Sequence, residues 1–167
     1  KGKKYIDIED KAFNFREFFK TYDNENPDIS KRGKFVHEKD VWEFLNLISR
    51  KEQYEDNETN FPFSTEYYRE NLKNTLWLVP GVAEARALSQ LMKKHDVFSR
   101  FEIVNVAGSG DSDSESNDAL EMVKKAIGDD PDNAYTITIT CGKLTTGVSI
   151  PAWTGILMLS NTTSPST

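Results

Sequence analysis

The chain has 167 residues, with 21 Lys or Arg against 27 Asp or Glu and a net charge of -6. This length is enough for one domain of ordinary size, and the acidic balance argues against a protein that binds nucleic acid through a general basic surface. A single cysteine excludes an intrachain disulfide. No signal segment and no apolar run of membrane-spanning length is evident, so we expect a cytoplasmic protein with no membrane partner.

Neither end of the sequence has capping or stop signals. It starts with KGKKY, and its last apolar run leads directly into NTTSPST. We therefore expect an excised part of a larger protein, whose remaining domains would be partners of this one.

Two segments near the start have apolar residues at helical spacing. They are FNFREFFKTY at 13–22 and DVWEFLNLIS at 40–49. The pattern predicts two amphipathic helices and a helical appendage over residues 1–60. Apolar stripes at this spacing form a core more often than a partner surface. The stripe residues are Phe15, Phe18, Phe19 and Tyr22 in the first segment and Val41, Phe44, Leu45 and Ile48 in the second.

From residue 61 the pattern changes to alternating strands and helices. A short helix in 61–73 could be capped by Ser64 or Thr65. Helices are expected within 82–95 and 117–127 because apolar residues share one face there. This alternation predicts an α/β fold over 61–167, with a parallel sheet flanked by helices. The expected strands are TLWLV, EIVNV, TITIT and ILML.

Glycines follow the predicted strands, at the ends where parallel α/β sheets bind ligands. Without a side chain, they would let backbone amides approach an anion, so three loops could form a phosphate track. For any one glycine, a tight turn is the commoner role. The acidic run Asp111, Asp113, Glu115 and Asp118 is expected to be a solvated, mobile loop rather than a metal site. The glycines are Gly81, Gly108, Gly110, Gly142 and Gly147.

The sequence offers no complete catalytic site. Neither GxxxxGK[ST] nor GxGxxG occurs, so the chain has no loop that grips a nucleotide triphosphate by itself. His37 and His95 lie in different segments without a nucleophile or carboxylate at catalytic spacing, so both are expected at the surface. Cys141 follows a buried strand, where a cysteine is more often a small apolar filler than a nucleophile. We expect no catalytic residue, metal site or cofactor in this part of the protein.

The order of three segments resembles the second RecA-like domain of superfamily-two helicases, in the restriction-enzyme branch. The segments are TLWLVPGVAEARALSQLMKKH, FEIVNVAG and YTITITCGKLTTGVSIPAWTGILMLSNTTSPS. TLWLVPG is similar to motif IV, and TTGVSIP to motif V, whose family form is TG, apolar, Asp, apolar, Pro. The resemblance covers about residues 61–167 and implies a RecA-like fold. In this family the DNA backbone crosses loops of two RecA-like domains and ATP binds between them.

This resemblance assigns roles to loop residues. Thr146, Gly147 and Ser149 would lie nearer the ATP cleft and couple it to DNA. Ser149 stands where the family usually has Asp, so a carboxylate contact is missing or replaced by a hydroxyl. Cys141 stands where many relatives have Thr, and motif VI would begin beyond Thr167. The residues expected to face DNA are Pro80, Gly81, Gly108, Ser109, Cys141, Gly142 and Lys143.

The resemblance implies part of an ATP-dependent DNA helicase or translocase of a restriction-modification enzyme. ATP and Mg²⁺ would bind the full-length protein, with the triphosphate loop, metal-binding acids and nuclease outside this chain. The fragment alone should then be inactive and bind DNA weakly. The alternative is a non-enzymatic α/β interaction module whose helical first 60 residues dock a partner.

Overall fold

The computed structural model describes residues 13–49, 63, 70–108, 113–141 and 150–161. Its centre is one four-stranded sheet in the order β2-β3-β1-β4, with every neighbouring pair parallel. The predicted parallel α/β sheet is therefore confirmed. The strands are β1 (Asn74–Leu78), β2 (Glu102–Asn105), β3 (Thr136–Thr140) and β4 (Gly155–Met158).

The two central strands, β1 and β3, are buried at every residue. Their register pairs Trp77 with Ile139 and Leu76 with Thr138. Because side chains alternate along a strand, Trp77 and Ile139 share one face while Leu76 and Thr138 share the other. Both faces of the sheet must therefore be covered, which is typical of parallel sheets.

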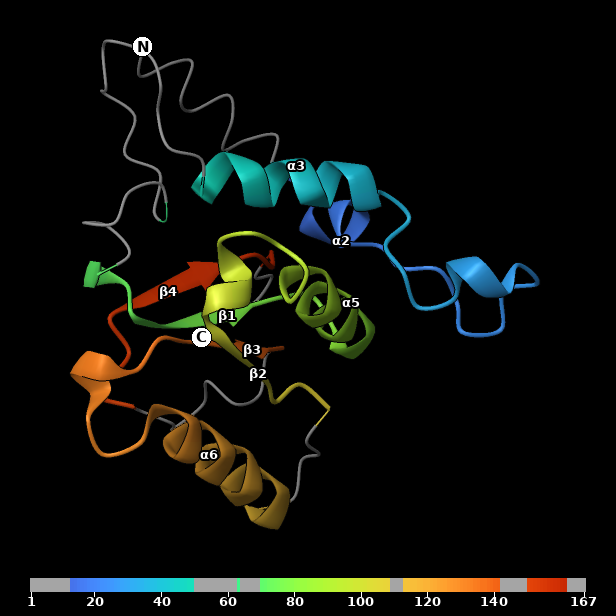
Figure 1. Ribbon diagram of the computed structural model, residues 1–167. Helices are drawn as coiled ribbons and strands as arrows, with labels where there is room; N and C mark the ends of the chain where they lie inside the picture. The colour runs from blue at the N-terminus through green and yellow to red at the C-terminus, as the bar shows by residue number, and fades with distance from the viewer. Residues whose placement is uncertain (1–12, 50–62, 64–69, 109–112, 142–149, 162–167) are drawn as a thin grey trace, which may run out of the picture.

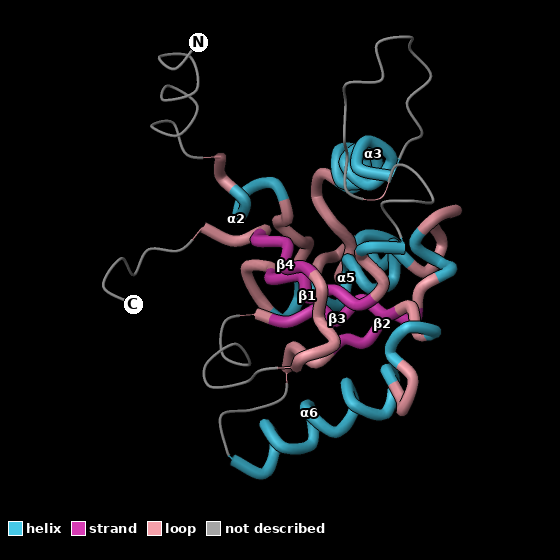
Figure 2. The backbone as a smooth tube through the Cα atoms, turned by 90° about the vertical axis from the view of Figure 1, so that its left-hand side faces the viewer, coloured by secondary structure: helices cyan, strands magenta, loops and turns pink. Residues whose placement is uncertain are grey.

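The two crossover helices cover opposite faces of the sheet (Figures 1 and 2). α5 (Val82–Met92) connects β1 to β2, and α6 (Asp113–Ile127) connects β2 to β3. The chain moves past β3 in the first connection and returns in the second, and right-handed crossovers then require opposite faces. Within the described residues, no helix has the length and apolar character needed to span a bilayer.

The acidic run before β3 is mostly helical, so its prediction as a mobile loop is wrong from Asp113 onward. α6 begins at Asp113 and includes Glu115 and Asp118. Acidic residues near a helix N-terminus favour the helix because they complement its dipole. Asp111 lies outside the described residues.

The N-terminal part contains two helices, of which the first is much shorter than predicted. α2 spans only Phe15–Phe18, and α3 spans Glu38–Ser49. After α2 the chain turns away, and Thr21 forms an antiparallel bridge with Phe35. Pairing with a distant segment thus overrides the helical spacing of 13–22. Three short 3₁₀ helices complete the described elements: η1 (Ile29–Lys31), η2 (Phe98–Arg100) and η3 (Pro131–Asn133).

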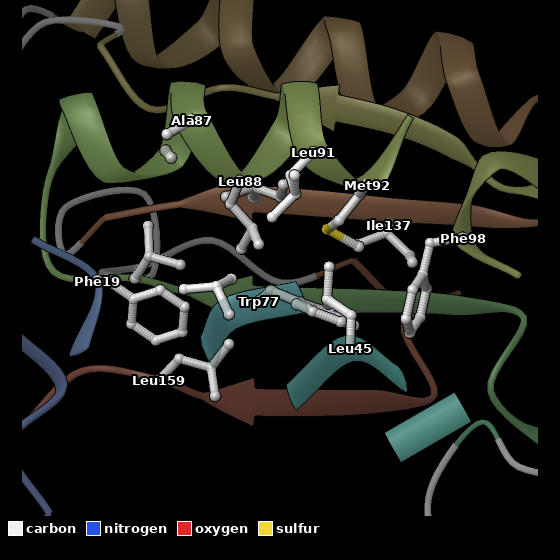
Figure 3. Packing of buried hydrophobic residues seen from close by; sticks show 14 of the residues in the cluster. Phe19, Leu45, Trp77, Ala87, Leu88, Leu91, Met92, Phe98, Ile137 and Leu159 are labelled. Carbon is white, nitrogen blue, oxygen red and sulfur yellow. The ribbon is translucent and has the colours of Figure 1, made fainter. Parts of the chain in front are cut away.

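The N-terminal helices share one hydrophobic core with the sheet. Phe19 and Leu45 are fully buried in the same cluster as Trp77, Leu88 and Ile137, and Figure 3 shows these side chains converging between α5 and the strands. The prediction that the apolar stripes form core is confirmed for Phe19, Val41, Leu45 and Ile48. A second cluster packs α6 on the opposite face and consists of Val104, Val106, Ala119, Val123, Ile127 and Ile150.

His95 is buried, with 3% of its surface exposed, so its predicted surface position is wrong. Its Nε2 lies 2.8 Å from Asn46 Oδ1, and its Nδ1 accepts from the Val97 amide at 3.1 Å. These partners require a neutral ring that carries its proton on Nε2. The ring also packs 4.9 Å from that of Trp42. The prediction fails because α3, distant in sequence, covers the end of α5.

We expect Leu45→Ala to lower the free energy of unfolding by about 2–5 kcal/mol, because it leaves a cavity in the shared core. Leu47→Ala is a matched control on the same helix, since Leu47 is 42% exposed. The control should change stability by less than about 0.5 kcal/mol. Urea unfolding would measure both variants. If Leu45→Ala loosened only the N-terminal helices, in a separate transition, the single core would be disproved.

Lowering the pH should reduce the free energy of unfolding because His95 is buried in its neutral form. Burial lowers the pKa of His95 below its ordinary 6.5, although the nearby Asp96 charge acts in the opposite direction. The unfolded chain therefore takes up a proton more readily, so the contribution of His95 is present above pH 6.5 and lost as pH falls toward the folded pKa.

The loss of stability between about pH 7.5 and about pH 5.5 should be smaller in His95→Gln than in the wild type. Urea unfolding at the two pH values measures it. An equal loss in His95→Gln and wild type would exclude His95 as the source.

Candidate functional site

The carboxyl ends of the four parallel strands lie side by side at one end of the sheet, which we call the carboxyl edge. The connections that leave the adjacent strands β1 and β3 diverge there. The connection from β1 passes over one face through α5, whereas the connection from β3 returns to the opposite face, where Ile150 and Trp153 pack with α6. Such a divergence between neighbouring strands is where open α/β sheets bind ligands. The two strand ends are tied by a hydrogen bond from the Val79 amide to the Thr140 carbonyl at 2.9 Å.

Pro80 and Gly81 form the β1 side of this divergence. Gly81 is the N-cap of α5 in an extended conformation, and no side chain caps the helix there. The first-turn amides of α5 therefore point toward the edge of the sheet, where a helix terminus favours negative charge. A carboxylate already lies close, because a Cβ built on Gly81 would stand 2.6 Å from Glu84 Oε1.

Gly108 brings the β2 loop against the start of α5. It has φ +94°, a conformation that L side chains rarely adopt, and a Cβ at this position would stand 3.3 Å from Val82 Cγ1. Before it, the Ala107 amide donates to Asn105 Oδ1 at 3.0 Å, which fixes the end of β2. Two of the three predicted loops are thus in contact.

Cys141 follows the central strand β3 and is half-buried beside this divergence. Its predicted role as an apolar filler stays a prediction. The structure therefore gathers Pro80, Gly81, Gly108 and Cys141 at one edge. The remaining predicted site residues lie outside the described residues: Ser109, Gly142, Lys143, Thr146, Gly147 and Ser149.

The described part of this edge has no cationic side chain. Its residues are 79–84, 105–108, 141 and 159–161, and none is Lys or Arg. An anion would be bound here by backbone amides, against the nearby Glu84 carboxylate. Among the residues that the structure describes, no group of three His, Cys, Asp or Glu is placed to hold a metal.

Glu84 and Asn105 are edge residues that sequence reasoning missed. Glu84 lies three residues after Gly81, the spacing at which an acidic residue often reaches back to the N-cap, so a signal was present. Asn105 had a weaker signal, since Asn side chains commonly bond the backbone two residues later.

A polar cluster lies at the opposite end of the sheet, where the strands begin. Lys73 Nζ lies 3.2 Å from Glu70 Oε1, and the Tyr135 hydroxyl donates to Glu70 at 2.5 Å. These two contacts lower the pKa of Glu70, the Tyr135 bond most strongly. The Asn74 side-chain amide (Nδ2) donates to the Pro131 carbonyl at 3.0 Å. These contacts join the segment before β3 to the start of β1, so we assign this cluster a structural role.

Comparison with known proteins gives one informative likeness. The chain is 29% identical over 154 residues to a Mycoplasma pneumoniae protein named "Putative type II restriction enzyme and methyltransferase RM.MpnORF110P C-terminus". The match covers 87% of this chain and 20% of that protein, so the chain spans about a fifth of its relative's length. No protein-family model matches the chain, and no solved structure does.

Alanine at Gly108 should destabilise the protein more than alanine at Gly128. Gly128 also has positive φ, at +75°, but apart from its chain neighbours nothing lies within 4 Å of a Cβ there. Gly128→Ala thus measures backbone strain of about 1–2 kcal/mol, and Gly108→Ala adds the displacement of Val82. The free energies of unfolding in urea would test the order. A smaller cost at Gly108 would show that the loop moves readily away from α5.

Proposed function

We propose that this chain is part of an ATP-dependent DNA translocase or helicase of a restriction-modification enzyme, and that it supplies part of the DNA-backbone track. The observation that carries this proposal is the likeness, over 87% of the chain, to a protein named as a restriction enzyme and methyltransferase. The parallel sheet and its glycine loops support the motor role, because their order along the chain resembles a second RecA-like domain.

In this proposal the DNA backbone crosses the carboxyl edge of the sheet near Gly81 and Gly108. The absence of side chains on these glycines would let phosphate oxygens approach the first-turn amides of α5. Binding through phosphates is independent of sequence, as a motor that moves along DNA requires. Lys143 would add one positive charge from the β3 loop.

Glu84 would weaken this contact. Its carboxylate lies beside Gly81, where it competes with a phosphate for the positive end of α5. A weak contact suits a track that must be bound and released repeatedly, while the remainder of the protein keeps hold of the DNA.

ATP and Mg²⁺ belong in this proposal to the intact protein. Thr146, Gly147 and Ser149 would line one side of the nucleotide cleft, and a loop outside this chain would hold the triphosphate. Residues 142–149 would then link the DNA track to that cleft, since they directly follow β3.

In the intact protein, Glu84→Gln should strengthen binding to duplex DNA about two- to five-fold at low salt, because it removes like charge from the phosphate path. Glu102→Gln is the matched control, since Glu102 is an exposed acidic residue at the start of β2, on the opposite edge. Fluorescence anisotropy of labelled DNA would measure both affinities. An equal effect of the two variants would remove this edge from the DNA path.

The motor role is tested with the same proteins by measuring ATP hydrolysis with and without DNA. We expect the wild-type intact protein to be stimulated by duplex DNA. Glu84→Gln should reach half-maximal stimulation at a lower DNA concentration than Glu102→Gln. Absence of any DNA-stimulated hydrolysis would contradict the motor and favour a non-enzymatic interaction module.

A further inference from the structure

An apolar groove lies between the start of α2 and one face of α3, next to Asn161 at the carboxyl edge of the sheet. Its apolar lining comes from Phe13, Phe18, Phe44 and Leu47, with Asp40 and Glu43 at its rim. Phe13 is 55% exposed and Leu47 is 42% exposed. Exposed large apolar side chains that gather in one groove are typical of protein interaction sites.

The groove is built on a helix whose core-facing residues are already packed. Val41, Leu45 and Ile48 of α3 are buried in the shared core. A surface helix normally becomes polar beyond its core-facing side, whereas the apolar surface of α3 continues past the half-buried Phe44 to the exposed Leu47. The core thus fixes the helix while its apolar surface extends outward to Leu47.

The exposed aromatic ring at the groove's edge is held in place before any partner binds. The Phe13 ring lies 5.3 Å from that of Phe18, which in turn lies 6.0 Å from Phe44. The Phe13 carbonyl accepts a hydrogen bond from Asn161 Nδ2 at 2.8 Å. A rigid aromatic side chain loses little conformational entropy on binding, which is a property of interface hot spots.

The acidic rim indicates the charge of the partner. Asp40 and Glu43 precede Phe44 and Leu47 on the same stripe, at spacings of three, four and seven residues along α3. Both carboxylates are exposed. They would repel nucleic acid phosphates and attract Lys or Arg, so the surface is complementary to a basic polypeptide.

We propose that this groove binds a basic amphipathic helix of a partner polypeptide, with its apolar stripe against Phe13, Phe44 and Leu47 and its cationic residues against Asp40 and Glu43. This is the helix-in-groove mode of recognition, in which anchors repeat at helical spacing. The groove residues are different from Gly81 and Gly108, and the proposal does not depend on the motor function.

The probe is a synthetic amphipathic peptide of about five helical turns, with Leu at i, i+3, i+4 and i+7 positions and Lys at the flanking positions. One comparison peptide has Glu in place of Lys. A second comparison peptide has the same composition as the basic peptide, but its Leu residues are spread around the helix and form no apolar face. Titration of each labelled peptide with the intact protein should give at least about ten-fold tighter binding of the first peptide than of either comparison peptide.

Two variants locate the binding surface. Leu47→Asp should weaken binding of the basic peptide about ten-fold or more. Glu43→Lys should weaken the basic peptide and strengthen the acidic one several-fold. Met122→Asp is the matched control, because Met122 is 49% exposed on a different helix, α6. It should leave binding unchanged.

Three results would overturn the proposal. The first is no binding of the basic peptide, and the second is equal binding of the basic and acidic peptides. The third is unchanged binding in both Leu47→Asp and Glu43→Lys, with thermal unfolding confirming that both variants are folded. Binding of duplex DNA that Leu47→Asp abolishes would assign the groove to nucleic acid instead.

Discussion

The two central strands are buried along their whole length, and this constraint determines the arrangement of the other elements. Neither face of β1 or β3 can meet water, so each face needs a covering layer. α6 covers one face, and α5 covers the other together with Phe19 and α3. The N-terminal helices therefore complete the core of the sheet, whichever partners the chain has.

The strands of the sheet could be predicted from the sequence because each strand is marked by its own short run of residues. TLWLV and TITIT are short, β-prone runs between helical patterns, and their parallel pairing follows from the crossovers. The failures involve long-range contacts. The helix expected over 13–22 ends early where Thr21 pairs with Phe35, and His95 is buried by Asn46 and Trp42 of α3. Neither contact leaves a trace in the neighbouring sequence.

The candidate site was predictable in position but not in chemistry. Glycines after parallel strands had to meet at one edge, and Gly81 and Gly108 do so. The contact of Gly108 with Val82 and the position of Glu84 over Gly81 depend on a loop and a side-chain conformation, which no residue pattern specifies. The groove on α3 shows the same limit, because Phe44 fits a core stripe and only the packed structure shows that Leu47 and Phe13 extend it outward.

The hydrogen bonds of Asn161 have a mechanical consequence. This residue accepts from the Phe15 amide at 3.0 Å and donates to the Phe13 carbonyl at 2.8 Å, so positions 146 and 148 residues apart in sequence are neighbours. The polypeptide thus enters and leaves the described region at one place. A pulling force on the two ends of the described region would act on these two exposed hydrogen bonds before it reached the hydrogen bonds between the strands. The two bonds of Asn161 could therefore break while the sheet stayed intact.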